Sequence, residues 1–202
     1  MFIPVCPFPN THWLVRCMQG DCILHRHEQY VKQTLRNRFD VLAANGRVAL
    51  TINVAGQKGN KVTMNNLQLT DEDWRKKIIA TLISAYSRAA FFEHYMPQIQ
   101  QVLSADFNSL ADFNMATIRW QLTQVQQPIP SISESHKSFA TMTHDEKQWT
   151  SSLEPAHNWP QLPAYPQVFM DRHPFQSNLS GIDLLMNLGP RAVDYLLLIK
   201  NG

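Results

Sequence analysis

The sequence predicts a mixed α/β fold, with a mostly antiparallel N-terminal sheet that includes a hairpin, a helical middle, and C-terminal helices that pack back. Short apolar runs separated by turn residues fill residues 2–69, and apolar side chains recur at helical spacing over residues 74–125. The chain has 202 residues, 44% of them hydrophobic, which is enough for one domain with a substantial core. We therefore predict a single domain over residues 1–202, in which the proline-rich residues 126–164 form an irregular insertion or lid.

The N-terminal part alternates between short strands and turns. Residues 2–6 are apolar and stop at a proline, which suits a strand end. Residues 10–18 favour a helix that ends at Gly20. The Asn45-Gly46 pair is typical of the tight turn between two hairpin strands. The other predicted strands cover residues 22–28, 38–42, 48–54 and 61–69.

Three helices are predicted in the middle of the chain. Thr70 and Asp73 have the spacing of a capping box, and apolar residues follow at helical spacing as far as Tyr86. A second helix includes residues 91–103, and a third begins after Ser109.

Two further helices are predicted at the C-terminus. Ser180 and Asp183 are expected to cap the first of them, and Gly189 fits the position just after its end. Pro190 suits the first position of the last helix, because its fixed φ is compatible with a helix start.

The charge balance argues against several partners. Eighteen Lys and Arg residues against sixteen Asp and Glu give a formal charge of +2, so no large field directs the protein to nucleic acid. No run of about 18 apolar residues is present, and the N-terminus lacks the basic residues of a signal peptide. The cysteines show no C-x-x-C spacing. We predict a cytoplasmic protein without membrane insertion or a nucleic-acid partner; the oligomeric state stays open.

The most unusual local composition is found in residues 30–38, YVKQTLRNR. This block contains Lys32, Arg36 and Arg38 and no acidic residue. Arginine offers a planar fork for carboxylate or phosphate, and lysine offers a point charge. The block therefore predicts a site for an anionic small molecule, such as the diphosphate of a nucleotide sugar. The alternative is a solvated turn whose cations pair with Glu28 or other nearby acids.

Two histidines precede this block. His25 and His27 are two residues apart on a predicted strand, and therefore on one face of it. Together with Cys22 they form C-x-x-H-x-H, but no second pair with zinc-ligand spacing follows. We therefore predict no metal site and assign one histidine as a general base, because imidazole titrates near neutral pH. The scattered glycines form no nucleotide-binding fingerprint, and no cofactor is predicted.

Two arginines of the helical middle are also candidates. Arg75 begins a predicted helix, where the helix dipole disfavours a cation, and this indicates a nearby anion or carboxylate. Arg88 ends the same predicted helix, where the dipole alone favours a cation.

Several segments, in this order and spacing, resemble the WbqC-like protein family over about residues 2–196. They are HEQYVKQTLRNR, the Asn45-Gly46 hairpin, DEDWRKKI with AYSRAAFFEHY, LADFN, and YPQVF with NLSGIDLLMNLGP. The resemblance implies a link to bacterial O-antigen and polysaccharide synthesis. A role proposed for such proteins is the transfer of glycine, or a related acyl group, to an amino sugar. The resemblance supplies candidate positions but no catalytic residues.

We therefore predict a transferase that modifies an activated amino sugar. The predicted catalytic residues are His27 and His25. The predicted substrate-binding residues are Tyr30, Lys32, Gln33, Arg36, Asn37, Arg38, Arg75, Arg88, Tyr165 and Gln167. The C-terminal segment with Tyr165 and Gln167 is expected to approach the basic block and close the pocket. The alternative is a non-catalytic protein that binds a sugar nucleotide or assembles a glycan-synthesis complex.

Overall fold

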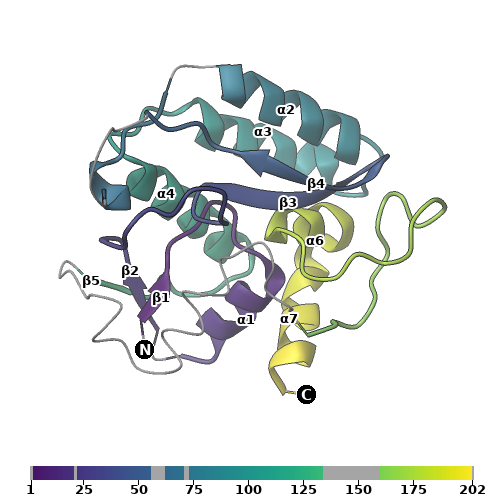
Figure 1. Ribbon diagram of the computed structural model, residues 1–202. Coiled ribbons are helices and arrows are strands. Elements are labelled where there is room, and N and C mark those ends of the chain that lie inside the picture. Colours follow the sequence, from purple (N-terminus) through teal and green to yellow (C-terminus); the bar gives the residue numbers. More distant parts are fainter. Residues whose placement is uncertain (1, 21, 56–61, 71–72, 134–159, 202) are drawn as a thin grey trace.

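The computed structural model describes residues 2–20, 22–55, 62–70, 73–133 and 160–201 (Figure 1). It confirms the mixed α/β class, with strands in the N-terminal part and helices in the middle and at the C-terminus. The helices are α1 (Thr11–Met18), α2 (Asp73–Tyr86), α3 (Phe92–Ser104), α4 (Leu110–Gln124), α6 (Gly181–Leu188) and α7 (Ala192–Asn201). The strands are β1 (Phe2–Pro4), β2 (Ile23–His25), β3 (Arg38–Ala43), β4 (Gly46–Thr51) and β5 (Ser131–Ser133). Residues 134–159, most of the predicted insertion, lie outside the described residues.

The three-stranded sheet is parallel, where the sequence predicted mostly antiparallel pairing. Its strand order is β1-β2-β5, with Ile3 opposite Leu24 and Leu24 opposite Ile132. The reason is the connection between β1 and β2. Helix α1 fills this connection and returns the chain to the end of the sheet where β1 began, so that β2 runs in the same direction as β1.

The predicted hairpin is confirmed as β3 and β4, which pair antiparallel around Asn45-Gly46. Gly46 has a φ of +103°, a conformation that glycine adopts without strain. Along β3, Phe39 and Val41 point into the core, and Arg38 and Asp40 therefore point to the opposite face. The hairpin thus has one apolar face and one face that begins with charged side chains.

The strand predicted over residues 61–69 is only partly formed. Gln29 forms an isolated bridge with Thr63, and Val54 forms another with Leu69, while the chain between them makes the 3-10 turn η1 (Met64–Asn66). Two short pairings therefore replace one continuous strand, and they tie this segment to the chain on both sides of the hairpin.

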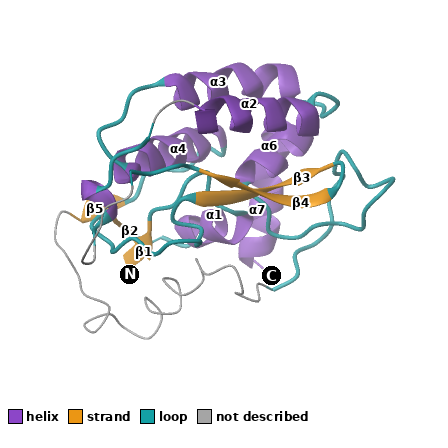
Figure 2. Cartoon of the chain, turned by 45° about the horizontal axis from the view of Figure 1, so that its top comes forward, coloured by secondary structure: helices purple, strands orange, loops and turns teal. Residues whose placement is uncertain are grey.

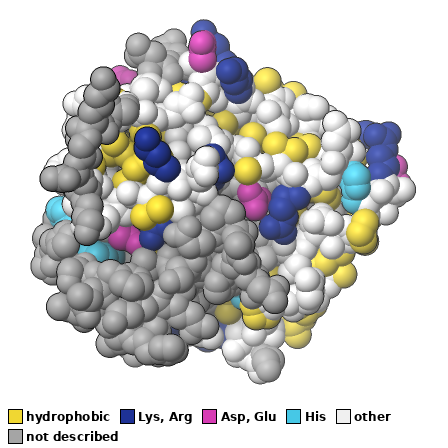
Figure 3. Space-filling view, in the orientation of Figure 1, with side chains coloured by type: hydrophobic (Ala, Val, Ile, Leu, Met, Phe, Trp, Pro, Cys, Tyr) yellow, Lys and Arg dark blue, Asp and Glu magenta, His cyan; other side chains and the backbone are white. Residues whose placement is uncertain are grey.

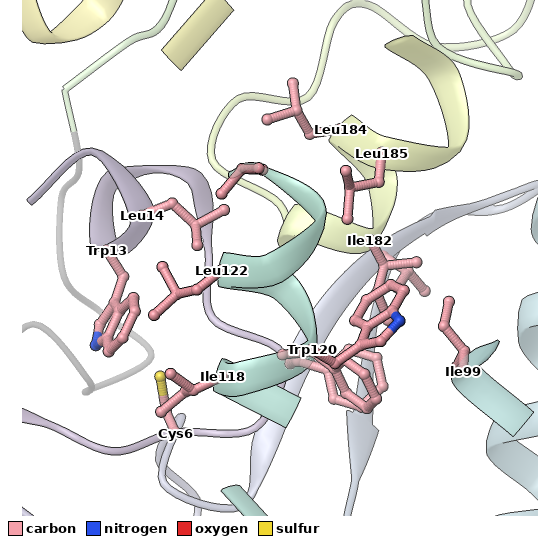
Figure 4. Packing of buried hydrophobic residues seen from close by; sticks show 14 of the residues in the cluster. Cys6, Trp13, Leu14, Ile99, Ile118, Trp120, Leu122, Ile182, Leu184 and Leu185 are labelled. Carbon is pink, nitrogen blue, oxygen red and sulfur yellow. The ribbon is translucent and has the colours of Figure 1, made fainter. Parts of the chain in front are cut away.

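Helices cover the hairpin from two sides. Figures 1 and 2 both show α2 and α3 side by side on one side of β3 and β4, with α1 and α7 on the other. Helix α4 is buried around most of its circumference, as expected for a central helix. Figure 4 shows Ile118 and Leu122 of this helix on the side of Trp13 and Leu14 of α1. No described helix is long and apolar enough to cross a membrane.

The C-terminal helices pack back onto the N-terminal part, as predicted. The Ser180 hydroxyl donates to the Phe8 carbonyl at 2.8 Å, and the Gly181 N–H donates to the Pro9 carbonyl at 2.8 Å. The Ser180 side chain also accepts from the Ile182 N–H, which confirms it as the cap of α6. A Cβ on Gly181 would collide with the side chains of Gln121 and Leu14, so this close approach requires glycine.

Candidate functional site

The basic block forms the connection between β2 and β3, and one of its arginines points into the protein. The Arg36 guanidinium donates to Glu28 Oε1 at 2.6 Å, and the two side chains are only 3% and 6% exposed. Next to them, the Asn114 amide donates to the Arg36 carbonyl at 2.9 Å. Arg36 therefore fixes the block to the protein interior through its side chain and its carbonyl group.

Asn37 has a similar supporting position. Its side-chain amide donates to the Ile52 carbonyl at 2.9 Å, and its own carbonyl accepts from the Ile52 N–H at 2.8 Å. Both contacts join the end of the block to the residue after β4. Arg36 and Asn37, which the sequence analysis assigned to substrate, thus fix the loop over residues 30–37.

Apart from the buried Thr34, the remaining polar residues of the loop lie at the surface. Lys32 and Gln33 are exposed, and Tyr30 is partly buried. Gln33 lies at the bend of the loop with a φ of +63°, and the Thr34 hydroxyl closes the turn by donating to the Val31 carbonyl at 2.8 Å. Lys32 is therefore the exposed cation of the loop, whereas Arg36 is buried.

Arg38 follows the loop as the first residue of β3. Burial raises the pKa of the Tyr30 hydroxyl, and the Arg38 charge opposes this shift. Burial also raises the pKa of Asp40, against the lowering effects of Arg47 and Arg38. The Arg38 Nε atom is covered and makes no hydrogen bond within the described part of the chain. Arg38 therefore acts on Tyr30 and Asp40 through its charge.

Arg75 lies at the same end of the hairpin as Arg38. Arg38 is opposite Thr51 in the β3–β4 register, and the Thr70 N–H donates to the Asn53 carbonyl just before α2 begins. Figure 1 accordingly shows the start of β3, the end of β4 and the start of α2 together. The Arg75 guanidinium lies 5.2 Å from the Trp74 ring centroid, and its Nε atom is covered without a hydrogen-bond partner among the described residues.

Arg88 lies far from this end. Thirteen residues along and beyond α2 separate it from Arg75, which corresponds to roughly 20 Å at helical rise. Its guanidinium lies 6.0 Å from the Phe169 ring centroid. Arg38 and Arg75 therefore belong to segments at the same end of the hairpin, whereas Arg88 lies toward the end where Tyr86 contacts Leu42.

The two histidines occupy different environments. His25 is the last residue of β2, is 2% exposed, and its ring meets the Phe2 ring edge-on at 5.5 Å. His27 is partly buried beyond the strand end, so strand alternation no longer places the two on one face. Between them, Arg26 forms an ion pair with Asp112 at 2.7 Å. No group of three or more metal-ligating side chains occurs among the described residues.

Tyr165 and Gln167 belong to a second, fully buried cluster around Asp183. The Tyr165 hydroxyl and the Gln167 amide donate to Asp183 Oδ2 at 2.6 and 2.8 Å. The Tyr86 hydroxyl donates to Asp183 Oδ1 at 2.9 Å and accepts from the Leu42 N–H at 3.4 Å. We call Tyr86, Tyr165, Gln167 and Asp183 the Asp183 network.

Sequence reasoning missed the centre of this network, because Asp183 was interpreted as a helix cap. Its carboxylate instead turns inward, where burial raises its pKa against the opposing effect of the three hydrogen bonds. Burial and the Asp183 charge raise the pKa values of Tyr86 and Tyr165 well above the usual value. Two signals in the sequence could have indicated this network. Asp183 is an acid within the apolar run that follows Ser180, and Tyr86 is a tyrosine on the apolar face of α2.

The Asp183 network is at the other end of β3 from Arg38. Leu42 is four residues along the strand from Arg38, which corresponds to roughly 14 Å. The C-terminal segment does reach β3, because the Ser180 N–H donates to the Asp40 carbonyl at 2.9 Å. It thus meets the strand after the basic block, and Tyr165 and Gln167 lie apart from Lys32 and Arg38.

The surface charge agrees with the small net charge of the chain. Figure 3 shows Lys and Arg side chains in several separate groups on the displayed face, without one continuous basic field. The outward cations Lys32 and Arg38, together with Arg75, therefore suit a small anion better than a long polyanion.

Comparisons with known proteins complete this description. Neither the curated proteins nor the solved structures contain a match to this chain. The model of the WbqC-like protein family matches residues 8–154, which include the basic block, the hairpin and helices α1 to α4. The match covers more than half of the sequence, and the chain therefore belongs to the WbqC-like protein family.

Proposed function

We propose that this protein is a transferase of bacterial surface-polysaccharide synthesis, of the O-antigen type, that transfers a glycyl or related acyl group to an activated amino sugar. Membership of the WbqC-like family supports the biological setting, because members of this family are associated with O-antigen genes. The whole chain is proposed to act as one domain, with residues 126–164 as an irregular insertion or lid.

The observation that supports a ligand site is that some polar residues of the basic block hold the loop in place, whereas others make no such contact. Arg36 and Asn37 fix the loop through buried contacts, whereas Lys32 makes no ion pair and Arg38 no hydrogen bond through its side chain within the described ranges. A rigid loop that presents cations loses little conformational entropy when it binds a phosphate. Lys32, Arg38 and Arg75 are proposed to bind the diphosphate, and Tyr30 and Gln33 to orient the sugar.

The proposed reaction forms a bond between the sugar nitrogen and the acyl carbon and breaks the bond between that carbon and its leaving group. The leaving group departs with the electron pair of the broken bond. His27 is proposed to take the proton from the attacking amine. His25 is proposed to act through its packing at the strand end, because its ring is almost fully covered. Tyr165 and Gln167 lie at the other end of β3 and are proposed to position the C-terminal segment through their hydrogen bonds to Asp183, without touching the substrate.

The binding step is tested by thermal unfolding with pyrophosphate, a nucleoside diphosphate and a nucleoside-diphosphate amino sugar. A ligand at about 100 times its dissociation constant adds about 2.7 kcal/mol of stability. We expect the amino-sugar compound to raise Tm in the native protein, and Lys32→Ala and Arg38→Ala to abolish the shift. Lys200→Ala, an exposed lysine on α7, is the matched control and keeps the shift. Equal shifts in all variants would place the anion elsewhere.

The covered histidines favour a second candidate function, in which the protein binds the sugar nucleotide without catalysis. His25 is 2% exposed, and the Nε2 atom of His27 is also covered. A His27→Asn variant separates the two functions. Lost transfer with unchanged ligand binding supports the transferase, whereas ligand binding by the native protein without transfer from glycyl or acyl donors supports the binding function.

A further inference from the structure

Two cysteines lie together at the turn between α1 and β2. Cys17 is in the last turn of α1, and Cys22 directly precedes β2. The Cys22 thiol donates to the Arg16 carbonyl at 3.3 Å, which places its sulfur beside the peptide unit that joins Arg16 to Cys17. The Cys22 thiol also lies close enough to Cys17 to add to burial in raising the pKa of the Cys17 thiol.

The backbone of the turn holds the two cysteines in this position. The Gln19 N–H donates to the Arg16 carbonyl at 3.2 Å, and the Gly20 N–H donates to the Cys17 carbonyl at 3.3 Å. Gly20 has a φ of +84°, which reverses the chain and brings Cys22 back toward the helix end. A disulfide joins two sulfurs at roughly 2 Å, and the Cys22 sulfur already lies 3.3 Å from the carbonyl oxygen of the peptide unit that begins Cys17, so rotation of the two side chains can bring the sulfurs together.

We propose that Cys17 and Cys22 are a dithiol that a small disulfide, such as oxidised glutathione, converts into an intramolecular disulfide. Cys17 is the thiol that reacts first with the small disulfide, because it is partly exposed whereas Cys22 is buried. The Cys17 thiolate attacks glutathione disulfide and releases one glutathione. The Cys22 thiolate then attacks the Cys17 sulfur and releases the second glutathione. Two S–H bonds are replaced by one S–S bond, and the glutathione disulfide takes up both electrons and both protons.

Cys6 is the third cysteine and is not part of this pair. It is 4% exposed, and Figure 4 shows it among the apolar side chains of the core near Ile118. Its thiol interacts electrostatically with Glu28 and Arg36, and burial raises its pKa. Burial and the contact with Cys22 also raise the pKa of Cys17, so the exchange is slow at neutral pH and is best followed in mildly alkaline solution.

The pair is tested by incubating the folded protein with oxidised glutathione, alkylating the remaining thiols and digesting with trypsin. Cleavage after Arg16 and Arg26 releases both cysteines on one peptide and leaves Cys6 on another. We expect the peptide over residues 17–26 to lose two hydrogens and to escape alkylation, with Cys6 still alkylated. A reductant must restore both thiols. Full alkylation of Cys17 and Cys22, or a bond from Cys6 to either of them, would overturn the proposal.

Two variants and one condition make the test specific. In Cys22→Ser, glutathione should stay bound to Cys17, because the sulfur that displaces it is gone. In Cys6→Ala, the disulfide should form as in the native protein. At one fixed ratio of reduced to oxidised glutathione, the equilibrium between the disulfide and the two thiols should favour the disulfide at least about tenfold more in the folded protein than in the protein unfolded in urea, because folding holds the Cys22 sulfur beside Cys17. Equal equilibrium constants in the two states would contradict a preformed pair.

Discussion

The Arg36 guanidinium donates to the Glu28 carboxylate at 2.6 Å inside the protein, whereas Lys32 of the same loop is exposed to solvent. A buried ion pair contributes little net stability compared with apolar residues, but removing one partner leaves an uncompensated buried charge. The pair therefore determines how the loop is held, and its loss should be visible in the stability of the whole domain.

The first prediction concerns this pair. Arg36→Met should lower the free energy of unfolding by about 3–5 kcal/mol, because Glu28 loses its buried cation. The double variant Arg36→Met with Glu28→Gln should recover part of this loss, since no unpaired charge is left. Urea unfolding measures both effects. If Arg36→Met lowered the free energy of unfolding by less than about 1 kcal/mol, the ion pair would be behaving as a solvent-exposed one.

The second prediction concerns the pH dependence of Asp183. Burial raises the pKa of its carboxyl group in the folded state, so the folded state binds the proton more tightly than the unfolded chain does. The stabilisation from protonated Asp183 is complete below the unfolded pKa of about 3.9 and is lost as pH rises through the folded pKa. We expect the stability advantage of the native protein over Asp183→Asn to shrink as pH rises above the unfolded pKa of about 3.9. An advantage that grows with pH would refute the assigned direction.

The third prediction concerns the hydroxyl donors of the same network. Tyr165→Phe removes the 2.6 Å hydrogen bond to Asp183 and should cost about 1.5–3 kcal/mol, the range for bonds to a charged group. Tyr86→Phe should cost at least as much, because it also leaves the buried Leu42 N–H without its acceptor. Tyr195→Phe is the matched control, since its hydroxyl donates to the neutral Pro163 carbonyl. Chemical unfolding of the three variants should rank Tyr195→Phe as the mildest.

The fourth prediction concerns Gly181, the first residue of α6. Helix propensity alone favours alanine over glycine by up to about 1 kcal/mol, so an unconstrained site would be stabilised by the change. In this protein the new Cβ would collide with Gln121 and Leu14, and we expect a loss of about 1–3 kcal/mol. The sign of the change in Tm decides between the two effects. A higher Tm for Gly181→Ala would mean that the neighbouring side chains move aside easily.

Local signals in the sequence predicted the local elements well. The Asn45-Gly46 pair marked the hairpin, and apolar spacing marked α2, α3 and α4. The parallel pairing of β1 and β2 was missed, although the predicted helix between them implied it. The expectation of antiparallel strands came from the hairpin, which is a separate pair of strands.

Side-chain direction was the part of the site that the sequence could not supply. Arg36 and Arg38 look alike in the basic block, and only the position of Glu28 in the fold turns Arg36 inward. Asp183 was assigned to a cap because Ser180 is three residues away, while its partner Tyr86 is 97 residues away. Sequence spacing reveals a neighbour three residues away, such as Ser180, but it does not reveal a partner 97 residues away, such as Tyr86.

The contacts between residues 8–12 and 178–181 have a consequence for synthesis on the ribosome. The Ser180 hydroxyl and the Phe8 carbonyl are separated by 172 positions, and the His12 N–H and the Asn178 side chain by 166. At translation rates of about 5–20 residues per second, the first helix waits on the order of ten seconds for these partners. During this time the nascent chain holds an incomplete core whose apolar surface is open to other molecules, including chaperones. The core around residues 8–12 can therefore be completed only after residues 178–181 have been translated.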